Sequence, residues 1–526
     1  MSILKRFKNN RIVRNAAMIA ASCITALSLS ACSLSGGSSV STLNSKQTDS
    51  SAEATVIETV AVTDKAAPSE NSSDRVSVTL SDTGSTSSSG SVEIEDGTIT
   101  ITEKGIYEFT GTLSDGQIIV DADDDEVEII LNGVSISNDS SAAIYVKQAE
   151  TVYITLADGS VNELSTTGEY VAINDNDIDA VIFSKDDLIM SGTGSLTIDN
   201  SYGHAVVGKD DLTVLSGTYD ITCAEDAFSG NDSLTIENGY FTINSGDDAL
   251  HSDLDTVING GTINIESCEE GIEGNTVTIN DGEITINAKD DGINAASDEG
   301  SSDTYITING GNILIVASGD GVDANGALYV NGGYTLIYGP TNDGNGSLDY
   351  DSTGRITGGT FIAIGSSGMA MNFSEAEQGS ILVNLDSSYG EGTTIKLTDP
   401  DGNVIIELEG KKTFSSVLIS TSDITSGGSY ILTVGDTETE IAMDGNIYGS
   451  GMPGFGEGFG GPGGQGGFGG PDGNFGGSGE NDGERPEMPS GEMPEGFEPP
   501  EGFDGQNPPE MPGGQMPGGA PEGKQR

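Results

Sequence analysis

The stretch Glu225-Asp226-Ala227-Phe228 decides the fold, because the same acidic motif returns along the chain about every 22 residues. Each copy has one or two acidic positions, a very small residue and a hydrophobic residue. The later copies are Asp247-Asp248-Ala249-Leu250, Glu269-Glu270-Gly271-Ile272, Asp290-Asp291-Gly292-Ile293 and Gly319-Asp320-Gly321-Val322. A fixed period of this length is typical of a solenoid, in which each period forms one unit that stacks on the next.

Two further features recur in phase with the motif and indicate the kind of solenoid. Each period holds two short runs of β-favouring residues, such as 233–236 and 240–243, and helix-favouring stretches are absent. A glycine that permits a tight turn recurs at Gly217, Gly239, Gly261, Gly282, Gly311 and Gly333. We predict an all-β fold, a right-handed parallel β-helix with coils of about 22 residues, most regular from residue 179 to 365. Stacked asparagines are expected to hydrogen-bond between coils; these are Asn238, Asn259, Asn280, Asn309 and Asn331.

The composition of the 526-residue chain fits a solenoid and limits its partners. Only 34% of the residues are hydrophobic, which is low for one compact globule but enough for a narrow core of stacked aliphatic side chains. The formal net charge of −63 argues against a nucleic-acid partner, because phosphate binding requires a basic surface. Cys223 and Cys268 lie about two coils apart, too far for a disulfide, and are expected to be small buried core residues.

The N-terminus has the features of an export signal. Basic residues between positions 5 and 14 overlap a mostly apolar stretch, and Leu29-Ser30-Ala31-Cys32 follows. This order favours a bacterial lipoprotein signal over residues 1–32, with Cys32 lipidated as the mature N-terminus; the alternative is an ordinary secretory signal. No later segment is long and apolar enough to span a bilayer. We expect an exported protein that is anchored by its lipid to the outer face of the cell membrane.

The rest of the chain divides by composition. Residues 33–75 are rich in Ser, Thr and Ala and resemble a flexible tether. The parallel β-helix is expected over 76–372, with irregular first coils up to about residue 170. A β-rich antiparallel C-terminal cap is expected over 373–447, where Asp399-Pro400-Asp401-Gly402 indicates a hairpin turn. Residues 448–526 consist mainly of Gly, Pro, Glu and Met and are expected to be disordered.

Acidic residues are expected to form vertical rows, because equivalent residues of successive coils lie above one another. One row would hold Asp226, Asp248, Glu270, Asp291 and Asp320, with Asp179, His204 and Asp343 toward its ends. The residues directly before this row are also acidic in four coils: Glu225, Asp247, Glu269 and Asp290. Three residues after the row, two further acids are expected to join the metal ligands, Glu273 and Asp323. Like charges at this spacing repel and destabilise the stack. Calcium would compensate them, because it binds about six to eight oxygen ligands and carboxylates of neighbouring coils can share an ion. Zinc fits less well, since the chain has two histidines and no suitable cysteine pair. The alternative is that these acids are turn residues that face water.

Three lysines beside acidic pairs point to a catalytic alternative. Lys185, Lys209 and Lys289 each precede two aspartates. A lysine near bound calcium could remove a proton from a uronate as the base of a polysaccharide lyase. Lys185 and Lys209 share one position in successive repeats, however, which is more typical of repeated surface residues than of a unique catalytic group.

The repeated acidic motif, the lipoprotein-like start, the cap and the tail together resemble a bacterial carbohydrate-binding β-helix family described from cellulose-degrading clostridia. The resemblance covers roughly residues 76–445 and rests on Glu225, Asp226, Asp247, Asp248, Glu269, Glu270, Asp290, Asp291 and Asp320. It implies a shape like that of pectate lyases, bound calcium, and binding of cellulose or an acidic plant polysaccharide such as polygalacturonate. The chain has no Trp, so it lacks the usual aromatic platform of cellulose binders. Tyr240 and Tyr334, which follow the glycine column, are the candidates for stacking on sugars, although packing at the core edge is an equal alternative.

Three functions therefore compete. The hypothesis that we carry forward is a monomeric, calcium-binding, non-catalytic polysaccharide-binding surface lipoprotein. The alternatives are a calcium-dependent polysaccharide lyase and a surface adhesin or structural solenoid with a protein partner.

Overall fold

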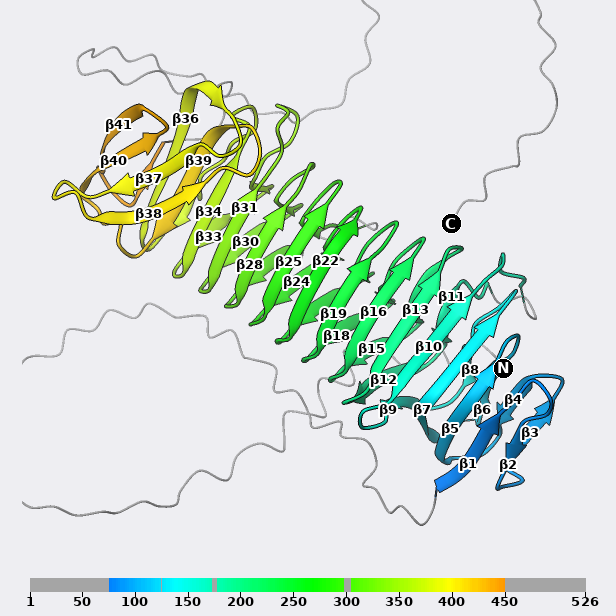
Figure 1. Cartoon of the computed structure of the whole chain (residues 1–526). Coiled ribbons are helices and arrows are strands. Elements are labelled where there is room, and N and C mark those ends of the chain that lie inside the picture. Colours follow the sequence, from blue (N-terminus) through cyan, green and yellow to red (C-terminus); the bar gives the residue numbers. More distant parts are fainter. Residues whose placement is uncertain (1–74, 124, 173–176, 298–303, 450–526) are drawn as a thin grey trace, which may run out of the picture. The chain divides into compact units, whose positions relative to one another are not determined.

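The structure is a computed structural model that describes residues 75–123, 125–172, 177–297 and 304–449, all within one compact unit. Cys32, the expected signal, and nearly all of the expected tether and tail lie outside the described residues. Within the described ranges the regular secondary structure is β-strand, and no helix is long and apolar enough to cross a membrane. The predicted parallel β-helix with an antiparallel C-terminal cap is confirmed (Figure 1).

Each regular coil contributes three strands, and strands of successive coils pair in parallel to form three stacks. The first stack directly follows the acidic motif of each coil, and its strands are short; sequence alternation had indicated only the other two. Three residues are too few for an alternating pattern to be visible. In chain order the first stack contains β3 (Val92–Glu95), β4 (Thr98–Ile101), β6 (Gln117–Asp121), β8 (Ile144–Gln148), β11 (Ala180–Ser184), β14 (His204–Gly208), β17 (Phe228–Gly230), β20 (Leu250–Ser252), β23 (Ile272–Gly274), β26 (Ile293–Ala295), β29 (Val322–Ala324) and β32 (Asp349–Tyr350). Its first strand, β3, is the exception to the parallel pairing, because it forms an antiparallel hairpin with β4.

The second and third stacks lie before and after the glycine column. The second stack contains β9 (Thr151–Leu156), β12 (Asp187–Gly192), β15 (Asp211–Val214), β18 (Ser233–Ile236), β21 (Asp255–Ile258), β24 (Thr276–Ile279), β27 (Tyr305–Ile308), β30 (Ala327–Val330), β33 (Gly354–Ile356) and β35 (Glu375–Ala376). The third stack contains β10 (Val161–Thr166), β13 (Ser195–Asn200), β16 (Thr218–Cys223), β19 (Tyr240–Asn244), β22 (Thr262–Cys268), β25 (Glu283–Ala288), β28 (Asn312–Val316), β31 (Tyr334–Tyr338) and β34 (Thr360–Gly365).

The first coils are less regular, as expected. Two long strands, β5 (Gly105–Leu113) and β7 (Glu126–Asn138), continue across the place where later coils turn; β7 pairs with both β9 and β10. At the beginning, β1 (Arg75–Leu80) pairs with β5 in parallel and with β2 (Thr86–Ser87) in antiparallel orientation.

Stacked aliphatic side chains fill the interior of the coils. The register places Ile198, Ile221, Ile243, Ile265, Ile286, Ile315 and Ile337 above one another, and all are buried. Cys223 and Cys268 are buried free thiols, as predicted. The glycine column also adopts the expected turn: Gly261 has a φ of 99°, a conformation that residues with a side chain rarely adopt.

Asparagines form a hydrogen-bonded ladder along the turn before that column. The Nδ2 group of Asn280 donates to Oδ1 of Asn259 at 2.7 Å, and the Asn309–Asn280 and Asn331–Asn309 bonds are each 2.8 Å. Asn259 in turn donates to Glu237 Oε1 at 3.0 Å. The predicted hydrogen bonding between asparagines of successive coils is confirmed, with one correction at the N-terminal end of the ladder. Ile236 pairs with Ile258, so the residue beside Asn259 in the preceding coil is Glu237 and not Asn238.

The C-terminal cap covers the last coil and the outside of the last strands of the third stack, β28, β31 and β34 (Figure 1). Its strands are β36 (Gly379–Tyr389), β37 (Thr394–Thr398), β38 (Val404–Glu409), β39 (Phe414–Thr421), β40 (Ser429–Val434), β41 (Thr437–Ala442) and β42 (Ile447–Tyr448). β39 pairs antiparallel with β34 and so closes the edge of the coil stack. β37, β38, β40 and β41 form a separate antiparallel sheet, which packs on Leu314, Leu336 and Tyr338. The predicted hairpin is present, with Ile395 opposite Leu408.

Candidate functional site

The acidic motif forms a row along the turn that leads into the first stack. Phe228 pairs with Val206 and with Leu250, and the same register continues through Ile272, Ile293 and Val322. The residue two positions before each pairing residue therefore stacks in what we call the acidic row: His204, Asp226, Asp248, Glu270, Asp291 and Asp320. This row was predicted from the spacing alone.

Both expected ends of the row are wrong by a few residues. Ala180 pairs with His204, so Asp179 lies one position outside the row. At the other end Asp323 pairs with Asp349, which places Gly346 and not Asp343 above Asp320. The connections next to both ends differ in length from the regular coils, so spacing alone could not fix the register there.

A second column runs along the outer face of the first stack, three residues after the row. We call it the outer column; it contains Ser229, His251, Glu273, Asn294, Asp323 and Asp349. Glu273 and Asp323 were predicted here, whereas Asp349 was missed, because its place in the column depends on the same irregular connection. The preceding row of Glu225, Asp247, Glu269 and Asp290 is also present, and Gly319 continues it.

Carboxylates of the acidic row bind the backbone of the next coil. Oδ1 of Asp226 accepts a hydrogen bond from the N–H of Asp248 at 3.2 Å, and Oδ1 of Asp320 accepts one from Gly346 at 2.7 Å. Asp291 does the same for Asp320. Each of these bonds uses one carboxylate oxygen to satisfy a turn N–H, so the row has a structural role in addition to any bound ion.

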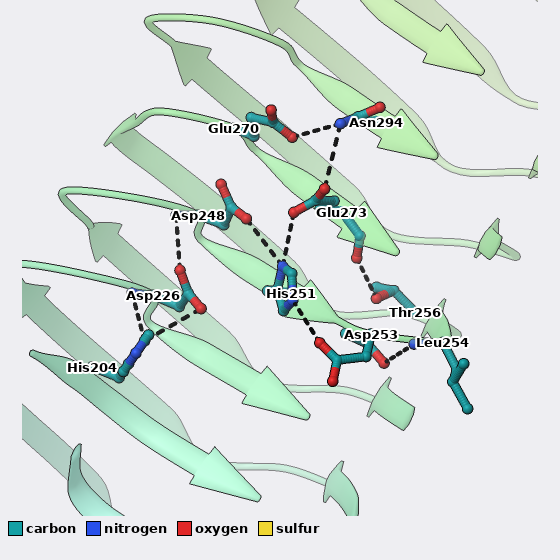
Figure 2. A network of polar contacts seen from close by, with 11 residues as sticks. His204, Asp226, Asp248, His251, Asp253, Leu254, Thr256, Glu270, Glu273 and Asn294 are labelled. Carbon is teal, nitrogen blue, oxygen red and sulfur yellow. Dashed lines mark hydrogen bonds and ion pairs between the residues drawn. The ribbon is translucent and has the colours of Figure 1, made fainter. Parts of the chain in front are cut away.

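The two histidines neutralise the N-terminal half of the row (Figure 2). His204 contacts Glu225 through Nε2 at 2.7 Å and Asp226 through Nδ1 at 3.2 Å. His251 lies between Asp248 at 3.1 Å and Glu273 at 2.8 Å.

These contacts shift the pKa values of the groups involved. Burial alone would lower the pKa of His204, but hydrogen bonds with Asp226 and Glu225 outweigh burial and raise it to about 10. Burial likewise opposes the shift of His251, whose pKa is raised to about 12 by its carboxylate partners. For Asp226 burial acts upward, yet the His204 bond lowers the pKa below its usual value. These carboxylates favour the protonated form of both histidines, although the N–H of Asp226 also donates to Nδ1 of His204 at 3.0 Å.

The C-terminal half has no such cation. We call Glu270, Asp291, Asp320, Asp323 and Asp349 the C-terminal acidic cluster; among the residues that the structure describes, none of them forms an ion pair with Lys, Arg or His. Burial is the main cause that raises the pKa of Asp291 to about 6 and the pKa of Glu270, Asp320 and Asp323 to about 7. Repulsion from neighbouring carboxylates adds to the shift in each case.

Two features beside this cluster bring side-chain oxygens close together: one amide oxygen has no partner, and two carboxylates pack against a glycine. Asn294 is 7% exposed; its Nδ2 donates to Glu270 at 2.8 Å, but its buried Oδ1 has no hydrogen-bond partner in the described structure. A Cβ atom on Gly319 would lie 2.1 Å from Oδ1 of Asp290 and 2.3 Å from Oδ1 of Asp291, so both carboxylates pack against the side of this glycine that has no side chain, and Oδ1 of Asp291 also accepts the Asp320 N–H. An amide oxygen and several carboxylates are the donor set that hard cations prefer.

Comparison with known proteins identifies the family. A family described as "Carbohydrate-binding domain-containing protein" matches residues 95–257 and 251–402, which together are more than half of the chain. The chain belongs to this family. A protein of the same description from Acetivibrio thermocellus is 39% identical over 126 residues, which span 23% of this chain and 44% of that protein. A solved structure described as that of a polysaccharide lyase-like protein from C. thermocellum, gadolinium derivative, aligns with 25% identity and a TM-score of 0.36 over 54% of this chain and 96% of that one.

In this carbohydrate-binding family member, the two tyrosines expected to stack on sugars lie away from the acidic row. Tyr240 is 65% exposed and Tyr334 is 39% exposed. They begin β19 and β31 and share one outward column, with Thr262, Glu283 and Asn312 between them. Four coils separate them, about 19 Å at a spacing of roughly 4.8 Å. Their contact with a glycan stays a prediction.

Among the described residues, groups of three possible ligands come close enough to hold a metal ion in the N-terminal half of the row. Side-chain oxygens of Asp226, Asp247 and Asp248 lie within 4.8 Å of one another, and so do ligand atoms of Asp248, His251 and Glu273. His204 and His251 offset part of the charge of these groups, whereas no histidine or other cation pairs with the C-terminal acidic cluster among the described residues. Of the lysines considered as a catalytic base, Lys209 has its Nζ 5.7 Å from the ring centre of Phe183, a cation–π arrangement.

Proposed function

We propose that this chain is a calcium-dependent, non-catalytic polysaccharide-binding protein that is exported and lipidated at Cys32. The C-terminal acidic cluster is the observation that carries the proposal. Its carboxylates are stacked in register and partly buried without a protein cation, beside the unpartnered Oδ1 of Asn294. A bound cation would remove the repulsion between coils and give that amide oxygen a partner.

Calcium is the ion that fits these groups best. The ligands are carboxylate and amide oxygens from several coils, and calcium accepts about six to eight oxygens in flexible geometry. Magnesium prefers strict octahedral geometry and retains several waters, which suits a wide row less well. Zinc favours nitrogen and sulfur ligands, which the C-terminal acidic cluster does not contain.

The proposed ligand is a plant polysaccharide, either cellulose or an acidic chain such as polygalacturonate. Family membership supports a carbohydrate ligand. A protein with a formal net charge of −63 repels a polyuronate, so the acidic ligand requires a cation that both partners share. The outward side chains of the third stack offer a long polar surface; Thr218, Tyr240, Thr262, Glu283 and Asn312 lie along it in one column.

The test is retention of the full chain on polygalacturonate and on cellulose, in calcium and again in EGTA. We expect retention on at least one glycan in calcium, with the glycan left intact. The variant D320N/D323N should lose calcium-dependent retention, whereas D281N should bind normally. Asp281 is a fair control because its Oδ1 accepts a hydrogen bond from a glycine N–H, Gly282 at 2.8 Å, as Asp320 does from Gly346.

Two outcomes would contradict the proposal. No retention on either glycan in calcium would favour a surface adhesin or structural solenoid. An unsaturated product that absorbs in the near ultraviolet would show lyase activity and overturn the non-catalytic assignment.

A further inference from the structure

A hollow lies along the turn between the first and second stacks, and we call it the turn recess. Its volume is about 590 Å³, which is within the range of roughly 300–1,000 Å³ that is usual for small-molecule sites. Successive coils contribute to its lining at Asn231, Asp253, Asn275 and Ala296. Three coil spacings of roughly 4.8 Å make it about 14 Å long, enough for a short segment of a polymer.

Connections of different length produce the recess. Asp253 and Leu254 connect β20 to β21, whereas Asn275 alone connects β23 to β24. The shorter turn is tight, since a Cβ atom on Gly274 would lie 3.0 Å from Oγ1 of Thr256. The coil of Asn275 therefore projects less than the preceding coil, and space remains beside Leu254.

Leu254 gives the turn recess an apolar surface. The register aligns it with Asp232 of the preceding coil, because Asp255 pairs with Ser233. Leu254 is 38% exposed and belongs to no buried core cluster of the described residues. An aliphatic side chain thus faces solvent where the coil before it has a carboxylate. The C–H face of a sugar ring can cover such a side chain and remove it from water.

The polar groups of the turn recess are held in place by contacts within the protein. Nε2 of His251 lies 3.3 Å from Oδ1 of Asp253, and its Nδ1 lies 2.8 Å from Glu273 (Figure 2). Oδ1 of Asn275 accepts a hydrogen bond from Thr304 at 3.1 Å, which leaves the Nδ2 group of Asn275 as a donor. Side chains that are already ordered do not have to lose freedom when a ligand binds.

The charge of the turn recess selects the class of ligand. Asp232, Asp253 and Glu273 line it, and His251 is the only basic residue among its described lining residues. Carboxylates accept hydrogen bonds from sugar hydroxyls, but they repel a sugar that carries a carboxylate of its own. The recess therefore suits a neutral sugar and disfavours a uronate.

We propose that the turn recess binds a short segment of a neutral glycan, with a sugar ring against Leu254 and sugar hydroxyls at Asp232, Asp253 and Asn275. This inference rests on the proposed function for the class of ligand. It adds a binding place that is separate from the tyrosine column, which lies at the start of the third stack.

Protection of a thiol at position 254 tests the proposal on the full chain in calcium. Cellotetraose, a neutral tetramer of β-linked glucose, should slow alkylation of L254C by iodoacetamide about tenfold, and tetragalacturonate should not. Mass spectrometry of the peptide around position 254 gives the rate. Cys223 and Cys268 should react little, because burial raises the pKa of both thiols to about 12.

The matched control for labelling is V171C, since Val171 is 61% exposed in a connection outside the turn recess. Its alkylation should be the same with and without cellotetraose. If cellotetraose does not slow alkylation of L254C, the proposal is overturned. Equal protection by tetragalacturonate would overturn the selection of a neutral sugar.

A change of charge at the same position tests the apolar contact by affinity. L254D introduces the residue type that the preceding coil carries at Asp232, so the turn should still form. Calorimetric titration should show cellotetraose binding weakened about tenfold, because the apolar surface under the sugar is lost. V171D should bind as the unchanged protein does. Equal affinities for L254D and V171D would contradict the contact with Leu254.

These measurements separate the turn recess from the proposed function. If the chain is retained on cellulose in calcium but position 254 is not protected, the glycan binds elsewhere and only the recess is ruled out. If position 254 is protected while D320N/D323N keeps its calcium-dependent retention, the recess is confirmed and the role of the C-terminal acidic cluster is wrong.

Discussion

Single residues determine where charge is balanced along the acidic row. His204 and His251 each occupy a position at which other coils carry an acidic or neutral polar residue, and each neutralises the carboxylates next to it. From Glu270 onward the chain supplies no such cation to the row, and the buried acids there hold raised pKa values. The histidines are therefore confined to one half of the row, although burial also raises the pKa of Asp248 beside His251 to about 8.

Asp320 offers a test in which the sign of the effect depends on calcium. An asparagine at this position keeps an oxygen for the Gly346 N–H but removes a buried charge. In EGTA, D320N should raise the free energy of unfolding by about 1 kcal/mol, a value reduced for the partial exposure of the group. In saturating calcium the same substitution should be destabilising, because it removes a ligand. Thermal unfolding in both buffers measures this, and a shift of the same sign in both would contradict calcium binding at Asp320.

At the level of elements, the register of the coils could be predicted where the repeats have nearly the same length, and it could not be predicted where the connections between strands differ in length. The equal spacing from Asp226 to Asp291 predicted the register of the row, and the structure confirms it. Asp179, Asp343 and Asn238 were misplaced because a shift of one to three residues in a turn is invisible in the spacing. The short first-stack strands were missed, since three residues show no alternation. The unpartnered Oδ1 of Asn294 depends on packing and could not be predicted from the sequence.

The asparagine ladder is an element whose contribution can be measured directly. N280A should remove the bonds that Asn280 makes to Asn259 and to Asn309. We expect a loss of about 1 kcal/mol, because exposed hydrogen bonds contribute toward the low end of roughly 0.5–1.5 kcal/mol each. N325A serves as the control, since Asn325 is an exposed turn residue whose side chain has no hydrogen bond in the described structure. Equal unfolding free energies for the two variants would show that the ladder contributes nothing.

For the whole molecule, the acidic charge predicts a stability that depends on both pH and calcium. Glu270, Asp320 and Asp323 have folded-state pKa values of about 7, above their unfolded values, so the folded chain binds more protons than the unfolded chain. Their contribution therefore favours folding below the unfolded pKa values near 4 and is lost as pH rises toward 7. The metal-free protein should melt at a higher temperature at pH 5 than at pH 8.

Calcium and a variant separate this effect from general charge repulsion. Saturating calcium should raise the melting temperature more at pH 8 than at pH 5, because the ion competes with protons for the same carboxylates. In EGTA, E270Q/D320N/D323N should show a smaller change between the two pH values than the unchanged chain. If the variant keeps the full change, the pH dependence comes from other groups of the chain, which include His204 and His251 with their raised pKa values.

The one-way direction of the asparagine ladder has a consequence for growth of the protein. Each asparagine amide donates a hydrogen bond to the coil on its N-terminal side. The series ends at Glu237, whose ionised carboxylate can only accept. At the other end, the hydroxyl of Thr357 donates to Asn331. Only the two ends are specialised, so a duplicated coil inserted between them finds the same partners above and below. Each added coil would lengthen the outer surface by roughly 4.8 Å, so gene duplication alone could extend that surface without new contacts at either end of the ladder.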